Sequence, residues 1–131
     1  MPDKIEKYTW GEFDEDCKKI AVWAKERHIK NIYGIPRGGL VVAVKLSHLL
    51  DMPLVLNRED ISRDTLIVDD IIDEGNTIER LLASIGEHHH IASVFYNKSA
   101  KHAPHFFARE KKGWVVFPWE TVETSKYDLT I

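Results

Sequence analysis

Residues 66 to 77 read Leu-Ile-Val-Asp-Asp-Ile-Ile-Asp-Glu-Gly-Asn-Thr, and this stretch decides the predicted fold. The apolar run at its start predicts a short strand that is buried on both faces. Two adjacent carboxylates, Asp69 and Asp70, follow that run, and Asp73 comes soon after. Gly75 then precedes a pattern typical of a helix, whose apolar positions are Ile78, Leu81, Leu82 and Ile85. This order suits a phosphorylated ligand with hydroxyl groups, because a helix N-terminus attracts phosphate and carboxylates accept hydroxyl protons or bind a hard cation.

The whole segment resembles the phosphoribosyl diphosphate (PRPP) signature of type I phosphoribosyltransferases. The resemblance implies that Asp69 and Asp70 hold the ribose hydroxyls of PRPP and a Mg²⁺ ion that bridges them to the diphosphate. It further implies that Asp73 is catalytic and takes the N7 proton of a base as N9 attacks C1 of the ribose. The implied PRPP-binding segment continues through the 5-phosphate loop, which consists of Glu74, Gly75, Asn76 and Thr77.

The composition predicts a single domain over residues 1–131. The chain has 44% apolar and 30% charged residues, as ordinary globular proteins do. A formal net charge of -3 gives no electrostatic reason to expect binding to nucleic acid or to a membrane surface. One cysteine, Cys17, rules out an internal disulfide and agrees with a reducing compartment. No stretch approaches transmembrane length and no apolar signal region opens the chain, so we expect a cytoplasmic protein.

Strand and helix patterns alternate along the chain without a repeat or a linker. Thr9 and Glu12 have the spacing of a capping box and predict a helix that lasts to about His28. The remaining expected elements are strands at 31–35, 54–56, 66–68 and 91–96, a helix from Leu40 to Leu49, and the helix after Gly75. Such alternation predicts a parallel sheet covered on both faces, with ligands beyond the carboxyl ends of its strands. The implied architecture is the α/β fold of type I phosphoribosyltransferases, a mainly parallel central sheet flanked by helices with a reduced hood.

Arg37, Gly38 and Gly39 follow the first predicted core strand and precede a helix. Two glycines let a backbone approach a ligand closely, and a guanidinium suits phosphate oxygens. The same three residues could form a plain turn. Residues 34–41 resemble the diphosphate-binding loop of the xanthine-guanine branch of the family, which implies that they bind the diphosphate of PRPP.

Residues 114–120 read Trp-Val-Val-Phe-Pro-Trp-Glu and are similar to a segment of bacterial xanthine-guanine phosphoribosyltransferases. The likeness implies that Trp114 stacks on a purine and that main-chain groups at Val115 read its edge. For Trp119 we expect a place in the core. Lys98 stands where the lysine of the family meets the oxygen at purine position 6, and a lysine donor would select 6-oxopurines over adenine. The resemblance thus implies purine salvage, in which PRPP and guanine, xanthine or hypoxanthine give a nucleotide and diphosphate, and a homo-oligomer such as a dimer or tetramer.

Two departures from the family pattern lead to a competing interpretation. Glu74 replaces a threonine or serine inside the phosphate loop, where a carboxylate is unfavourable unless it points away or meets a cation. The segment 57–65 is too short for the mobile lid of relatives, so water could reach the reacting centre. Both departures favour a non-catalytic regulator that binds PRPP or a nucleotide on the same fold. Asp73, Lys98 and Trp114 favour the enzyme.

Two other interpretations find little support in the residues. The run Glu87-His88-His89-His90 invites a metal site, but adjacent histidines on a short connection do not converge easily on one ion. A phosphoacceptor receiver domain would need a lone aspartate at the end of a separate strand, and the other strand ends offer none.

Overall fold

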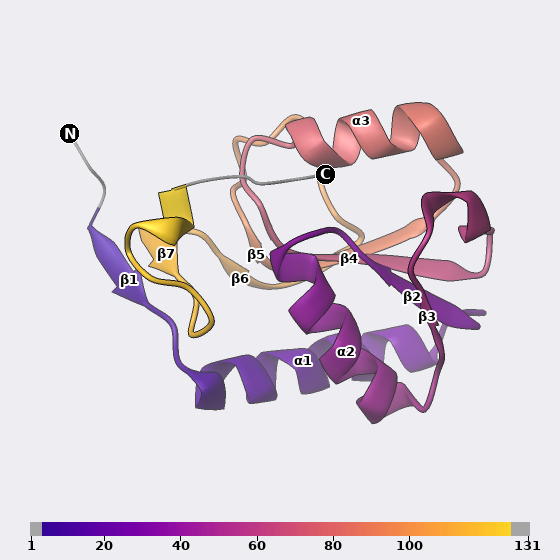
Figure 1. Ribbon diagram of the computed structural model, residues 1–131, viewed down its shortest axis with the longest axis horizontal. Coiled ribbons are helices and arrows are strands. Elements are labelled where there is room, and N and C mark those ends of the chain that lie inside the picture. The colour runs from indigo at the N-terminus through magenta and orange to yellow at the C-terminus, as the bar shows by residue number, and fades with distance from the viewer. Residues whose placement is uncertain (1–3, 127–131) are drawn as a thin grey trace.

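Five parallel strands form the central sheet, in the order β3-β2-β4-β5-β6 (Figure 1). The computed structural model describes residues 4–126. The strands of the central sheet are β2 (Asn31–Gly34), β3 (Leu54–Val55), β4 (Thr65–Ile72), β5 (His90–Tyr96) and β6 (Phe106–Glu110). The helices are α1 (Trp10–Lys25), α2 (Gly38–Leu50) and α3 (Asn76–Ile85), with short 3-10 helices η1 (Arg58–Asp60) and η2 (Thr124–Lys126). A second parallel pair joins β1 (Ile5–Lys7) to β7 (Trp114–Val116).

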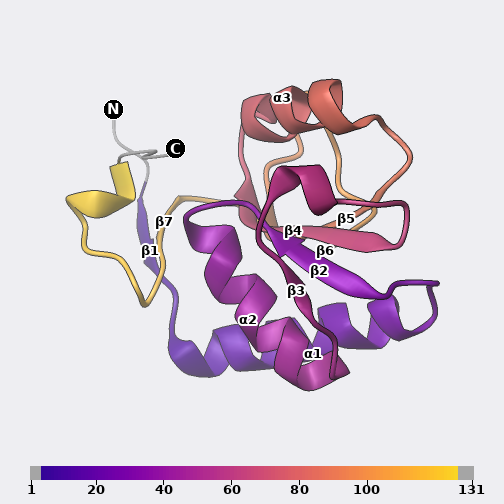
Figure 2. The same ribbon diagram turned by 45° about the vertical axis from the view of Figure 1, so that its right-hand side comes forward.

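Alternating side chains of the central strands bury both faces of the sheet. Leu66 and Val68 of β4 pack with α1 and α2 in one buried cluster, whereas Ile67 packs with α3 in another. Figures 1 and 2 show the same division, with α1 and α2 below the sheet and α3 above it. The α/β class and the mainly parallel sheet covered on both faces, as predicted from the sequence, are confirmed. Among residues 4–126, no helix combines the length and the apolar character that a membrane crossing requires.

The acidic pair lies inside a strand and not after it. β4 runs eight residues to Ile72, so Asp69 and Asp70 belong to it and the predicted strand end at residue 68 is wrong. The reason is the neighbouring strand: β2 pairs with β4 only as far as Val68, but β5 continues the pairing through Ile72. The acids therefore lie where β4 has lost one neighbour and kept the other.

Helix α1 ends at Lys25, three residues before the predicted end near His28. The N–H of Glu26 donates to carbonyls of the last turn, and the chain leaves the helix at that point. The start agrees with the prediction, since Thr9 and Glu12 form the complete capping box.

The sequence did not predict β1, β6 or β7. β1 and β7 lie far apart along the chain and pair with each other at one end of the molecule (Figure 1). No residue of strand β6 is fully buried, so the strand lacks the alternation of buried and exposed residues by which strands are recognised in a sequence. The β1-β7 pair is a small sheet separate from the central one. Together with the segment after β7, it stands in the place of the reduced hood that the family resemblance implied.

Candidate functional site

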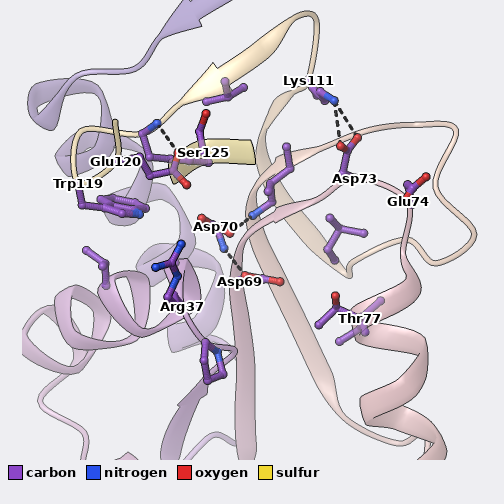
Figure 3. A pocket seen from close by; sticks show the side chains of 18 of the residues that line it. Arg37, Asp69, Asp70, Asp73, Glu74, Thr77, Lys111, Trp119, Glu120 and Ser125 are labelled. Carbon is purple, nitrogen blue, oxygen red and sulfur yellow. Dashed lines mark hydrogen bonds and ion pairs between the residues drawn. The ribbon is translucent and has the colours of Figure 1, made fainter. Parts of the chain in front are cut away.

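A cavity of about 690 Å³ opens where the central sheet meets the β1-β7 pair. Its walls come from the start of α2, the end of β4, the start of α3 and the segment around β7 (Figure 3). These segments are far apart in sequence and meet because β2 and β4 are neighbours that point the same way. The predicted site residues that line the cavity are Arg37, Gly38, Asp69, Asp70, Asp73, Glu74, Gly75, Asn76, Thr77, Trp114 and Val115.

The acidic pair lies directly against the loop before α2. A Cβ atom built on Gly38 would lie 1.8 Å from Oδ2 of Asp70, so no other residue fits there without displacing that carboxylate. The backbone also fixes the carboxylates, because Asp69 Oδ1 accepts from the Asp70 N–H at 2.9 Å and Asp70 Oδ1 accepts from the Ile71 N–H at 2.8 Å. The peptide bond between Pro36 and Arg37 is cis. Gly38 thus lets the start of α2 approach the Asp70 carboxylate of β4 closely.

Two helix N-termini at the cavity have no side-chain cap. Thr9 and Glu12 cap α1, whereas the side chain of Arg37 before α2 makes no capping hydrogen bond and Gly75 before α3 has no side chain to make one. The first N–H groups of a helix need partners, and an anion can supply them. Both helices are long enough for a full dipole, so the cavity has two places suited to phosphate oxygens.

Gly75 allows the turn into α3. Its φ of +89° lies in the left-handed region, and a Cβ atom there would lie 2.9 Å from the backbone N of His102. The preceding Glu74 is exposed, and its Oε1 lies 3.4 Å from Nδ2 of Asn76. Glu74 still lines the cavity, and its carboxylate is accommodated there by solvent and by the amide of Asn76.

The carboxylate of Asp73 accepts from two other side chains. Nζ of Lys111 donates to Oδ1 at 2.9 Å and to Oδ2 at 3.0 Å (Figure 3). Nδ2 of Asn97 donates to Oδ1 at 3.0 Å. Lys111 is only 12% exposed and lines the cavity. The sequence analysis missed Lys111 and Asn97. No local pattern marked either residue, because both reach Asp73 only through the pairing of β5 with β4 and of β6 with β5.

The β7 segment supplies aromatic surface to the cavity. The indole of Trp114 is half-buried, and its Nε1 donates to Oγ of Ser125 at 3.1 Å. Val115 is buried, and both residues line the cavity. Trp119 stacks on Phe117 with ring centroids 4.9 Å apart and is partly buried against the core, so its predicted core position is confirmed only in part. Trp119 also borders the cavity, so the aromatic wall is wider than the sequence indicated.

Comparison with known proteins finds similar sequences and similar structures. The xanthine-guanine phosphoribosyltransferase of Nitratidesulfovibrio vulgaris is 27% identical over 141 residues, which cover 90% of this chain and 86% of the relative. A purine phosphoribosyltransferase from Pyrococcus horikoshii superposes with a TM-score of 0.77 at 28% identity, covering 89% of this chain and 95% of the other. The chain resembles the purine phosphoribosyltransferases and shares their fold. No protein-family model matches it.

A further structure supports the fold alone. The xanthine-guanine-hypoxanthine phosphoribosyltransferase of Helicobacter pylori superposes with a TM-score of 0.79 at 23% identity, covering 94% of this chain and 97% of that protein. The sequence-based resemblance and the type I phosphoribosyltransferase fold are thus confirmed.

Two residues that the family resemblance assigned to the site do not line the cavity. Nζ of Lys98 lies 3.6 Å from Oε1 of Glu110, and the Lys98 side chain is 66% exposed. Gly39 is buried behind the loop, where a Cβ atom would lie 2.7 Å from the carbonyl oxygen of Val68. Gly39 therefore permits close packing of α2 on β4. The role of Lys98 with a purine base stays a prediction, and its side chain would have to move to fulfil it.

Glu120 joins the acidic side of the cavity, although the sequence analysis gave it no role. Burial raises the pKa of its carboxyl, and the nearby Asp70 raises it further. Oε1 of Glu120 accepts from the N–H of Phe117 at 3.0 Å. This hydrogen bond and the positive charge of Arg37 lower the pKa of Glu120 and so offset part of the increase. The exposed Arg37 lies on the same side of the cavity as these carboxylates and offsets part of their negative charge (Figure 3).

The remaining two predictions concern the short loop and the histidines. Within the described part of the chain, no residue of 57–65 borders the cavity, and the segment folds into η1 beside the sheet. The described residues also contain no group of three or more histidine, cysteine, aspartate or glutamate side chains that could hold a metal ion.

Proposed function

We propose that the protein transfers the phosphoribosyl group of PRPP to N9 of a 6-oxopurine and releases diphosphate. The observation that carries the proposal is that one cavity joins two uncapped helix N-termini, an acidic pair and an aromatic wall. The first two suit a doubly phosphorylated ribose, and the third suits a planar base. The names of the similar proteins support purine substrates.

The residues of the chain divide the work of the proposed reaction. The N-terminus of α3, with Gly75 to Thr77, receives the 5-phosphate, and Arg37 with the Gly38 backbone receives the diphosphate. As the bond from C1 to the diphosphate breaks, N9 of the base forms the new bond to C1, and Asp73 accepts the proton from N7. The transition state carries positive charge at C1, so positioning and electrostatics supply most of the rate enhancement.

The acidic pair fits a magnesium ion only in part. Asp69 and Asp70 border the cavity, but the described residues supply no third ligand group there. Two carboxylates with the oxygens of a diphosphate and ribose would match the preference of Mg²⁺ for few protein ligands. We therefore assign Asp69 and Asp70 as the residues that would hold Mg²⁺, which when bound offsets the negative charge on the departing diphosphate.

The second candidate is a regulator that binds PRPP or a nucleotide without turnover. The observation that favours it is the segment 57–65, which provides no cover for the cavity. Both candidates place the phosphates at the same helix N-termini, so binding alone does not separate them. Cytoplasmic location and assembly into a dimer or tetramer remain predictions from the sequence.

The decisive experiment incubates the protein with PRPP, Mg²⁺ and each purine, and measures nucleotide and diphosphate. We expect nucleotide from guanine, xanthine or hypoxanthine and little from adenine. Asp70→Asn should abolish turnover, whereas Asp64→Asn, at the part-exposed position just before the opposite end of β4, should not. PRPP binding without nucleotide formation would favour the regulator, and equal use of adenine and guanine would contradict the 6-oxopurine assignment.

A further inference from the structure

Among the described residues, three lysine or arginine side chains line the cavity, and one of them, Arg80 of α3, is not engaged by the protein. Lys111 donates to both oxygens of Asp73, and the charge of Arg37 acts on Glu120. Arg80 is exposed and makes no hydrogen bond, ion pair or ring contact within the part of the chain that the structure describes. Its guanidinium, which carries several N–H donors, is therefore free to bind a ligand.

Arg80 lies one turn into α3, on the helix face that continues the phosphate loop. It follows Asn76 by four residues and Thr77 by three, so the three side chains share one face, and all three line the cavity. Side chains of a helix lean toward its N-terminus, and four residues span only about 6 Å along the axis. The long arginine side chain covers that distance. Its guanidinium thus reaches the first turn of α3, where the proposed function places the 5-phosphate of PRPP.

Glu74 puts a negative charge into the same phosphate loop. Figure 3 shows Glu74 and Thr77 at the start of α3, and both line the cavity. Oε1 of Glu74 lies 3.4 Å from the neutral amide of Asn76, and no ion pair joins Glu74 to a cation among the described residues. Like charges a few ångström apart repel even in water, so this carboxylate opposes the binding of a phosphate. The loop needs a positive charge from outside its own residues, and Arg80 is the unengaged cation on the adjoining helix face.

We propose that Arg80 binds the 5-phosphate of PRPP and supplies the positive charge that lets the loop carry Glu74. This inference rests on the proposed function and adds a binding residue to its phosphate site. The free N–H groups at the start of α3 donate to some of the phosphate oxygens. The planar guanidinium of Arg80 donates to the remaining oxygens, in the two-pronged geometry that arginine forms with phosphate.

Binding of ribose 5-phosphate, measured by calorimetry, tests the inference without turnover. Arg80→Met removes the charge and keeps a long side chain that suits a helix. We expect its Kd for ribose 5-phosphate to rise about 10-fold, as for the loss of an exposed hydrogen bond to a charged group. Its Kd for inorganic diphosphate with Mg²⁺, which the proposed function places at the start of α2, should change less than about 2-fold, because salt screens the more distant charge. Arg63→Met, at an exposed arginine outside the cavity, is the matched control and should change neither value.

Glu74→Thr separates contact with the phosphate from simple neutralisation of Glu74. Removing the carboxylate should strengthen ribose 5-phosphate binding about 3-fold. Arg80→Met should still weaken binding about 10-fold when it is combined with Glu74→Thr, because the guanidinium contacts the phosphate itself. If that loss disappears in the double variant, Arg80 serves only to neutralise Glu74 and the inference is wrong.

The other outcomes are equally decisive. An unchanged Kd for ribose 5-phosphate in folded Arg80→Met, an equal loss for diphosphate, or no binding of ribose 5-phosphate by the wild type would refute the inference, and circular dichroism checks folding. Arg80→Lys keeps the charge without the planar fork and should recover only part of the affinity. If binding follows these expectations but the wild type forms no nucleotide from PRPP and any purine, the proposed enzyme is wrong and the role of Arg80 stands.

Discussion

Arg109→Met removes the cation that joins β6 to α1, and we expect it to destabilise the protein strongly. Nε of Arg109 donates to Oδ2 of Asp16 at 2.6 Å, and Nη1 donates to Oε2 of Glu12 at 3.1 Å. Asp16 is completely buried, and the buried hydroxyl of Tyr8 donates to the same oxygen. Burial raises the pKa of the Tyr8 phenol, and its hydrogen bond to Asp16 adds to this, so the phenol stays a donor throughout the physiological range.

The magnitude follows from the charge that the substitution leaves behind. Removing one partner of a buried ion pair costs about 3–5 kcal/mol when the other charge stays buried without compensation. Asp16 keeps the hydroxyl of Tyr8 and the exposed Lys19, whose Nζ lies 3.6 Å from Oδ1, so the cost here lies toward the lower end. The Arg109 side chain is 37% exposed, so water replaces part of its contribution, and we expect a loss of about 2–4 kcal/mol. For 131 residues the unfolding entropy is about 0.28 kcal/mol/K, so Tm should fall by about 7–15 °C.

Urea and thermal unfolding followed by circular dichroism measure this loss. Lys18→Met, which removes an exposed lysine paired with acids of the same helix, is the matched control and should stay within about 0.5 kcal/mol. Asp16→Asn keeps an acceptor for Tyr8 and removes the buried charge, so adding it to Arg109→Met should recover part of the lost stability. A loss below about 1 kcal/mol, or a double variant less stable than Arg109→Met, would refute the reasoning.

Four further predictions concern the site. Asp73→Asn should lower kcat by about 10²–10⁴ with PRPP binding retained, and an unchanged kcat in a folded variant would show that the proton leaves by another route. Gly38→Ala should displace Asp70 and weaken PRPP binding measured by calorimetry with Mg²⁺, and equal affinity would contradict the close approach. Because the pKa of Glu120 is raised, ionisation of its carboxyl lowers the stability of the protein as pH rises from about 4.5 through the raised value. Glu120→Gln should therefore gain stability relative to wild type over that pH range. A pH-independent difference in unfolding free energy between the two proteins would count against this prediction. If residues 57–65 form no lid, PRPP should release diphosphate without a base at a rate comparable with transfer. Hydrogen exchange of 57–65 should also change little on adding PRPP and Mg²⁺. Diphosphate release only together with transfer to a base, with strong protection of 57–65, would overturn that view.

The sequence alone determined the fold class and the phosphate-binding half of the site. The sequence signals were the periodicity of the strands, the run of acids after Val68 and the glycine before α3. Each depends only on neighbouring residues, so each can be recognised from the sequence. The carboxyl ends of parallel neighbouring strands meet at one edge of a sheet, so the sequence also placed Arg37 near Asp70. The confirmed resemblance to phosphoribosyltransferases adds to the same local signals.

The tertiary structure decided what depends on pairing between distant segments. The length of β4 follows from its pairing with β5, which carries Asp69 and Asp70 inside the strand. The β1-β7 pair joins the two ends of the described chain, and no local pattern specifies such a partner. Both Lys98 and Lys111 follow strand ends, and only the pairing of β6 with β5, which bonds the Lys111 N–H to the carbonyl of Tyr96, puts Lys111 on Asp73 and leaves Lys98 at the surface. Local sequence reveals which residue types are present, but the direction of a long lysine side chain depends on charges that the fold brings from elsewhere.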